Sequence, residues 1–173
     1  MLQVTLDTAC IIDAAEGTHA ASEIHELVQL ARDGKIGVCL TSGFEVDQVR
    51  ASEENYRRNL AWLSGQPIVR IPGVFRLDVS VLDGPDVLAS DEVAAVDEKI
   101  MRILRPSWRP GQAFPERKVN DVHHLSAHYM SGNAIFVTRD NDDIIRRAGP
   151  LKHEVGIVVM NTMDALAYVK ANI

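Results

Sequence analysis

The sequence lacks most of the features that mark secreted, membrane-spanning or zinc-finger proteins. Its two cysteines, Cys10 and Cys39, are far apart and have no CxxC spacing, which argues against a disulfide scaffold or a zinc finger. No apolar run approaches the roughly 20 residues that a membrane-spanning helix needs. The segment Met1–Thr5 has no basic stretch followed by a long apolar core, so no signal peptide is indicated and a cytoplasmic protein is expected.

The chain also has no surplus of basic residues. Its 24 acidic and 18 basic residues give a formal net charge of −6. This balance argues against a general nucleic-acid coat protein, which would carry a broad basic face. A nuclease is still compatible, because an acidic metal site contributes negative charge that bound cations cancel.

Apolar strands alternate with amphipathic helices along the chain, which predicts an α/β protein with a mostly parallel sheet between two layers of helices. The expected strands cover 3–6, 36–40, 134–138 and 155–159. The expected helices cover 20–32, 42–63, a segment capped by Ser90, 120–131, 142–148 and a final segment from 162.

The 173 residues suffice for one well-buried domain, 1–173. Six of the seven prolines fall between Gln66 and Glu116. The segment 66–118 is therefore expected to be an elaboration on the core, since its apolar content is too thin for a second core. Val74–Leu82 alternates weakly and is interpreted as an extra strand.

Five acidic residues lie where an α/β fold would bring them to one edge of its sheet. Asp7 and Asp140 each follow an apolar strand, and Asp142 comes two positions later. Glu45 and Asp121 lie in the first turns of expected helices. Carboxyl ends of parallel strands and amino ends of the returning helices share an edge, where ligands bind. So much negative charge needs a cation, protons or arginines to offset it, and the pattern predicts a divalent-metal site.

Several of these acids also have a purely structural interpretation. Asp7 could cap the next helix or begin a turn. Ser42 and Glu45 fit the S-x-x-E capping box. Asp121 follows Asn120, a good N-cap, and could only favour the helix dipole.

The turn Thr138–Asp143 is harder to explain as a cap. It places three acids in four positions, more than one cap needs. Hard oxygen ligands at a strand end suit Mg²⁺ or Mn²⁺. The combination of acids carries the prediction, because each acid alone is a weak signal.

His124 and His128 offer a rival, zinc-binding interpretation. With Asp121 they share one helical face. They lack the H-E-x-x-H pattern, however, and no cysteine is suitably spaced. Packing, or hydrogen bonding to the metal ligands, is therefore the favoured role for both histidines.

A nuclease also needs groups that hold a phosphate backbone. Arg139 and Arg146 flank the acidic turn, together with Arg147, and Lys118 precedes Asp121. Thr8 adds a hydroxyl beside Asp7. We expect Thr8, Lys118, Arg139 and Arg146 to contact the substrate.

At this point the pattern resembles the PIN domain family, and is similar to the toxin ribonucleases of VapBC-type toxin–antitoxin pairs. The last matching segment contains Thr-x-Asp-x-Asp (Thr138, Asp140, Asp142), which is typical of the family, and the segments occur in the family's order. The matching segments are Val4–Thr8, Thr41–Glu45, Asp121–Gly132 and Ala134–Asp142.

The resemblance implies a fold, an activity and a set of roles. Asp7, Glu45, Asp121 and Asp140 would form the catalytic acidic quartet, with Asp142 as an auxiliary metal ligand. PIN nucleases cut RNA, less often DNA, with Mg²⁺ or Mn²⁺, and leave a 3′-hydroxyl and a 5′-phosphate. An antitoxin partner and a homodimer are further expectations that rest on the resemblance alone.

Two other interpretations remain. The chain could be a catalytically inactive PIN-like module that binds RNA or protein. A haloacid-dehalogenase-type phosphatase also has Asp after its first strand, but it requires Asp-x-Asp, and this chain has Asp7-Thr8-Ala9.

Overall fold

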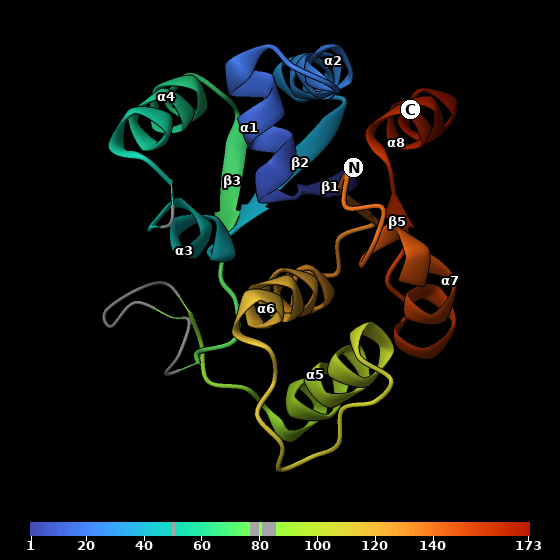
Figure 1. Cartoon of the computed structure of the whole chain (residues 1–173). Helices are drawn as coiled ribbons and strands as arrows, with labels where there is room; N and C mark the ends of the chain where they lie inside the picture. The colour runs from blue at the N-terminus through green and yellow to red at the C-terminus, as the bar shows by residue number, and fades with distance from the viewer. Residues whose placement is uncertain (50, 77–79, 81–85) are drawn as a thin grey trace.

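The computed structural model describes residues 1–49, 51–76, 80 and 86–173. Within them the strands form one five-stranded parallel sheet in the order β3-β2-β1-β4-β5 (Figure 1). Val4 at the centre of the sheet pairs with Val38 on one side and with Ile135 on the other. The strands are β1 (Leu2–Leu6), β2 (Ile36–Thr41), β3 (Ile68–Ile71), β4 (Ile135–Val137) and β5 (Val159–Met160).

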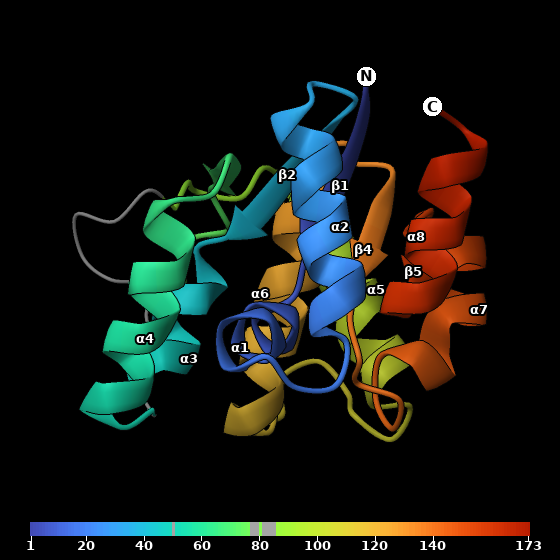
Figure 2. The ribbon, with the colours of Figure 1, turned by 90° about the horizontal axis from the view of Figure 1, so that it is seen from above.

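Helices cover both faces of this sheet. Figure 2 looks down on the first layer, with α4, α2 and α8 lying across it from left to right. The first layer contains α1 (Thr8–Glu16), α2 (Ala21–Arg32), α4 (Glu53–Ser64) and α8 (Thr162–Ala171). The second contains α5 (Asp91–Leu104), α6 (Glu116–Met130), η1 (Ile145–Arg147), α7 (Ala148–Pro150) and η2 (Leu151–Val155).

Alternation along the strands divides the core between the two faces. In β4, Ile135 and Val137 belong to the apolar cluster under α1, α2 and α8, whereas Phe136 belongs to the cluster under α5 and α6. Side chains of successive strand residues point to opposite faces, which produces this division. The expected three-layer α/β/α fold is confirmed.

The helix predicted over 42–63 is in fact two helices. The first, α3 (Gly43–Val49), lies at the carboxyl end of β2, and α4 begins anew after Ser52. The Ser52 hydroxyl accepts a hydrogen bond from the Asn55 amide, so a second N-cap interrupts the apolar pattern.

The start of α6 also differs from the prediction. The helix begins at Glu116, after Pro115, and not at Asn120. Asn120 is therefore inside the helix, and Asp121 lies in its second turn. Because neither residue is at the helix terminus, the capping interpretation of this pair is wrong.

Other differences are local. The helix α1 and the strand β3 were not predicted, and η1 begins at Ile145, three residues after the expected start. A π-helical turn extends to Val155, so β5 begins at Val159 and not at 155. The predicted strand Val74–Leu82 lies largely outside the described residues; Val74 itself forms an isolated bridge with Val87.

Much of the proline-rich elaboration packs on the second face. Ser90 caps α5, with its hydroxyl accepting from the Val93 amide, as the sequence predicts. Ile100 and Ile103 of α5 pack in the same apolar cluster as Leu125 of α6. The described part of the chain contains no helix with both the length and the apolar character needed to cross a membrane.

Candidate functional site

Asp7 lies at the carboxyl end of β1 and caps α1. Its Oδ1 accepts from the Thr8 amide at 2.7 Å, and its Oδ2 accepts from the Thr138 hydroxyl at 2.6 Å. Thr138 follows β4, so this bond ties the ends of two neighbouring strands together. Asp7 is buried, and burial raises the pKa of its carboxyl.

The turn after β4 is organised around Asp140. The Thr138 hydroxyl accepts from the Asp140 amide at 3.0 Å. Asp140 Oδ1 in turn accepts from the amides of Asp142 and Asp143, at 3.1 and 3.0 Å. One carboxylate oxygen of Asp140 therefore shapes the turn, and the other lies 3.9 Å from Lys118 Nζ, while the Asp142 side chain is exposed.

Lys118 of α6 reaches the acids of this turn. Its Nζ lies 2.9 Å from Asp121 Oδ2 and 3.9 Å from Asp140 Oδ2, and it also forms an ion pair with Asp143. Even with Lys118 adjacent, burial raises the pKa of Asp121 to about 6. Burial opposes protonation of Lys118, but Asp143 and Asp121 outweigh it and raise the lysine pKa.

A second basic group, the His124 imidazole, is buried among the acids. Its Nε2 is 3.1 Å from Asp47 Oδ2 and 3.4 Å from the Thr8 hydroxyl, and its Nδ1 contacts the Thr41 hydroxyl. Burial opposes protonation of His124, but hydrogen bonding to Asp47 and the charges of Asp7, Asp47 and Asp121 outweigh it, so its pKa is raised.

Asp47 lies among the acids of this edge, although the sequence analysis did not select it. Glu45, which the sequence analysis did select, lies apart from the other acids. Glu45 pairs with Arg70 at 3.0 Å, with 46% of its side chain exposed. Asp47 lies one turn after Gly43, on the face of α3 that meets α6. A Cβ on Gly43 would lie 2.8 Å from the His124 ring. In the sequence, Gly43 was the available signal, because glycine allows a backbone to approach a neighbour closely.

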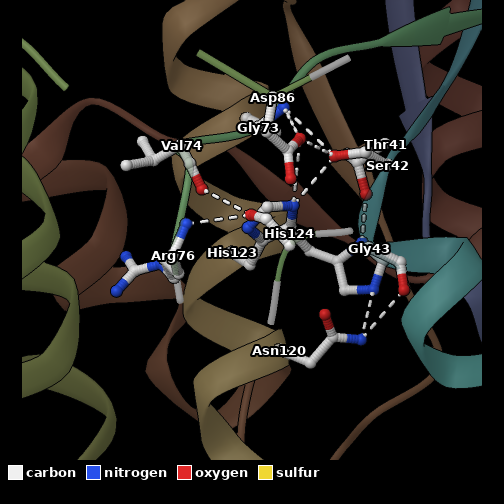
Figure 3. A network of polar contacts seen from close by, with 12 residues as sticks. Thr41, Ser42, Gly43, Gly73, Val74, Arg76, Asp86, Asn120, His123 and His124 are labelled. Atoms are coloured by element: carbon white, nitrogen blue, oxygen red, sulfur yellow. Dashed lines mark hydrogen bonds and ion pairs between the residues drawn. The ribbon is translucent and has the colours of Figure 1, made fainter. Parts of the chain in front are cut away.

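The Ser42 side chain has a different role from the predicted capping box. Its hydroxyl donates to Asp86, lies 2.8 Å from His123 Nε2, and accepts from the Gly73 amide at 3.1 Å (Figure 3). Burial lowers the pKa of His123 to about 4, so this imidazole is neutral. The network joins β2, α6 and the segment after β3, and Glu45 takes no part in these contacts.

Both histidines of the rival zinc pattern pack against the sheet. His124 contacts Thr41 at the end of β2, and His128 Nδ1 lies 2.8 Å from the Thr5 hydroxyl of β1. The His128 ring meets Phe136 edge-on, with centroids 5.6 Å apart. The favoured structural role of the two histidines agrees with these contacts.

The residues expected to bind substrate differ in their exposure. Thr8 is buried at 4% exposure, and Lys118 is engaged by the acids. Arg139 Nε lies 3.0 Å from Asp13 Oδ2, a buried carboxylate of α1. Arg146, on η1, is exposed and lies one turn beyond the acidic turn.

A cavity of about 400 Å³ opens between α3 and α4. Glu45 and Gln48 of α3 contribute to its wall, and Tyr56 contributes from α4. Of the acids expected at the site, Glu45 contributes to this cavity, whereas Asp7, Asp121 and Asp140 are not among its lining residues.

The donor chemistry of the site fits a hard divalent cation. Asp7, Asp47, Asp121 and Asp140 offer carboxylate oxygens from four elements, and burial raises the pKa of Asp7 and Asp121 despite the nearby His124 and Lys118. Among the described residues, however, no three carboxylates, imidazoles or thiols lie close enough together to hold one ion. Lys118 and His124 lie between the acids.

No protein-family model matches the chain, and no curated protein matches it. The chain is similar to one in the crystal structure of VapBC2 from Rickettsia felis bound to a DNA fragment from their promoter. The comparison covers 92% of this chain and 98% of that chain, at 14% identity and a TM-score of 0.51. Identity this low supports a likeness of fold alone. The chain therefore has a PIN-like three-layer α/β/α fold.

Proposed function

We propose that this chain is a Mg²⁺- or Mn²⁺-dependent ribonuclease that hydrolyses RNA phosphodiester bonds at the carboxyl edge of its sheet. The observation that carries the proposal is that Asp7, Asp121 and Asp140 come from three separate elements to one edge of the sheet, where the charge of Asp7 acts on Asp121 and Lys118 faces both Asp121 and Asp140. Two of these carboxyls are held in buried positions that raise their pKa, an arrangement that costs folding energy. The PIN-like fold supports the same activity.

Asp7, Asp47, Asp121 and Asp140 are the residues that would hold the ion, with Glu45 and Asp142 farther out. A bound divalent ion supplies a Lewis acid that lowers the pKa of a water molecule and offsets charge on the phosphate.

Residues of this chain would position the metal ligands and the substrate phosphate. Thr138 fixes Asp7 and the Asp140 amide together. Arg146 is exposed beside the turn, where it would meet a phosphate backbone.

The attacking group would be water. Ser42 is buried and bonded to Asp86 and His123, so its hydroxyl is not open to a substrate. Burial raises the pKa of the Cys10 thiol well above its usual range, which keeps it protonated and weakly nucleophilic.

The test is cleavage of an RNA panel by the purified protein with Mn²⁺ or Mg²⁺, with and without chelator. Asp7→Asn and Asp140→Asn should each abolish cleavage while the circular dichroism spectrum is kept. Asp33→Asn, at the exposed end of α2, is the matched control and should cleave as the wild type does. Equal cleavage by all four proteins, or cleavage that chelator leaves unchanged, would contradict the proposal.

The inactive binding module is a second candidate, because Lys118 and His124 already lie among the acids. In such a module the acids and cations would form a permanent ion-pair network. Calorimetric titration with Mn²⁺ separates the two: the nuclease should bind the ion, and the inactive module should release no heat.

A protein partner belongs to the same proposal. The similar structure is one of VapBC2 with promoter DNA. We infer that this chain also acts as the toxin of a toxin–antitoxin pair, and that it forms a homodimer. A neighbouring gene for a small DNA-binding protein, and co-purification of its product with this chain, would support that assignment.

A further inference from the structure

Lys118 differs from an ordinary surface lysine in what surrounds its ammonium group. Its side chain is only 17% exposed, and its Nζ faces Asp121 on the same helix and both Asp140 and Asp143 on the turn after β4. Most exposed lysines pair with one acid at most and gain little from it. Here one ammonium faces three carboxylates from two elements.

Two of these three acids are residues that the proposed function assigns to the metal. Nζ is 2.9 Å from Asp121 Oδ2 and 3.9 Å from Asp140 Oδ2, so it lies between the two carboxylates. A lysine ammonium is a compact charge on a flexible four-carbon stem, so it can leave this position by rotating side-chain bonds without movement of α6. The ammonium and a metal ion therefore compete for the same oxygens.

We propose that Lys118 is a built-in competitor for the divalent ion, and that its departure from Asp121 and Asp140 sets the metal affinity of the site. The inference rests on the proposed metal site. In the structure, Lys118 already offsets part of the negative charge of Asp121 and Asp140. The inference also predicts a role for Lys118 other than the direct substrate contact expected from the sequence.

The competition has a thermodynamic consequence that does not depend on catalysis. Binding of the ion includes the cost of breaking the Lys118 ion pairs, so removing the ammonium should tighten binding. Without metal, the same change leaves three carboxylates with no nearby lysine and should lower stability. Metal should then stabilise the variant more than it stabilises the wild type.

The experiment is calorimetric titration with Mn²⁺ alone, in the absence of RNA, on the full chain. Lys118→Met should bind Mn²⁺ at least about tenfold more tightly than the wild type, a difference of about 1.4 kcal/mol. Lys152→Met, at an exposed position on η2, removes the same net charge and should leave the affinity unchanged. A second readout is the unfolding temperature, which Mn²⁺ should raise more in Lys118→Met than in the wild type.

The possible outcomes are distinct. Equal or weaker Mn²⁺ binding by Lys118→Met would overturn the competitor role and leave the metal site standing. Absence of Mn²⁺ binding in both proteins would overturn the metal site as well. If Lys118→Met does not fold, Lys118→Gln takes its place, because its amide is neutral and still donates hydrogen bonds.

Discussion

Two acids of α3, only two positions apart, have opposite surroundings. Glu45 pairs with Arg70 near the surface, whereas Asp47 contacts His124 and its charge acts on Asp7. Two positions along a helix correspond to about 200° of rotation, so the two side chains leave on opposite faces. The sequence shows both acids but not the rotation of the helix, which is why Asp47 was missed.

Asp47→Asn should therefore affect the metal site more than Glu45→Gln. We expect Asp47→Asn to weaken Mn²⁺ binding by at least about 100-fold, beyond the loss typical of a residue that only supports a ligand. Glu45→Gln should weaken it by less than about tenfold. Calorimetric titration measures both, and a larger loss for Glu45→Gln would return Glu45 to the centre of the site.

A buried imidazole gives the protein a defined pH dependence. Burial lowers the pKa of His128 to about 4, whereas the imidazole of an unfolded chain has a pKa of about 6.5. The unfolded chain takes up this proton at higher pH, so the contribution of His128 to stability is complete above about pH 6.5 and is lost as the pH falls toward about 4.

The free energy of unfolding differs between these two pH limits. His128→Gln should reduce that difference by up to about 3 kcal/mol. Urea unfolding at about pH 7 and about pH 4.5 measures it. His153→Gln, at an exposed position on η2, is the control. An unchanged difference in His128→Gln would show that another group carries the pH dependence.

At the scale of elements, the contact between α3 and α6 decides where Asp47 points. Gly43 lies so close to α6 that an added Cβ would be 2.8 Å from the His124 ring and 2.9 Å from Asn120 Oδ1. Asn120 in turn donates to the Gly43 carbonyl oxygen at 3.1 Å. A side chain at this position would therefore require His124 and Asn120, or the two helices, to shift.

Gly43→Ala should lower the free energy of unfolding by about 1–3 kcal/mol, as overpacking does elsewhere, and should weaken Mn²⁺ binding. Gly149→Ala, where an added Cβ meets nothing within 4 Å, is the matched control and should stay within about 0.5 kcal/mol of the wild type. Urea unfolding measures the free energies. Wild-type stability in Gly43→Ala would mean that the contact between α3 and α6 can adjust without cost.

The order of elements was predictable from hydrophobic periodicity, but several boundaries were not. The strands that alternate with long helices stood out because their apolar runs are unbroken. The start of α6 was misplaced, because Asn120 looks like a cap until its side chain is seen to donate to Gly43. β3 is only four residues long, and two of them are exposed, so it has little apolar pattern to detect.

Part of the candidate site was also predictable, because it depends on where the strands end. Asp7 and Asp140 follow strands, so the fold alone places them at one edge. The positions of Lys118 and His124 depend on how α6 crosses that edge, which is a property of packing. No local pattern in the sequence specifies it.

At the scale of the whole molecule, the proline-rich elaboration forms part of the core. Ile100 of α5 is fully buried and packs with residues of α6, β4 and η2. The second face of the sheet therefore depends on a segment that the sequence marks as an addition.

Ile100→Ala should destabilise the whole protein by about 2–5 kcal/mol, in a single unfolding transition. Leu88→Ala, whose side chain is 84% exposed, should change stability by no more than about 0.5 kcal/mol. Urea unfolding followed by circular dichroism and by tryptophan fluorescence tests both statements. Separate transitions for the two signals would show that the elaboration unfolds on its own.

The helix α1 is fastened to the acidic turn at two points. Asp7 at its start accepts from Thr138, and Asp13 near its end pairs with Arg139, the residue before Asp140. Two anchors about one and a half helical turns apart hold the helix and the turn as one rigid unit. Asp7 and Asp140 are thus preorganised, and a ligand that joins them loses little binding free energy to the conformational entropy of ordering a loop.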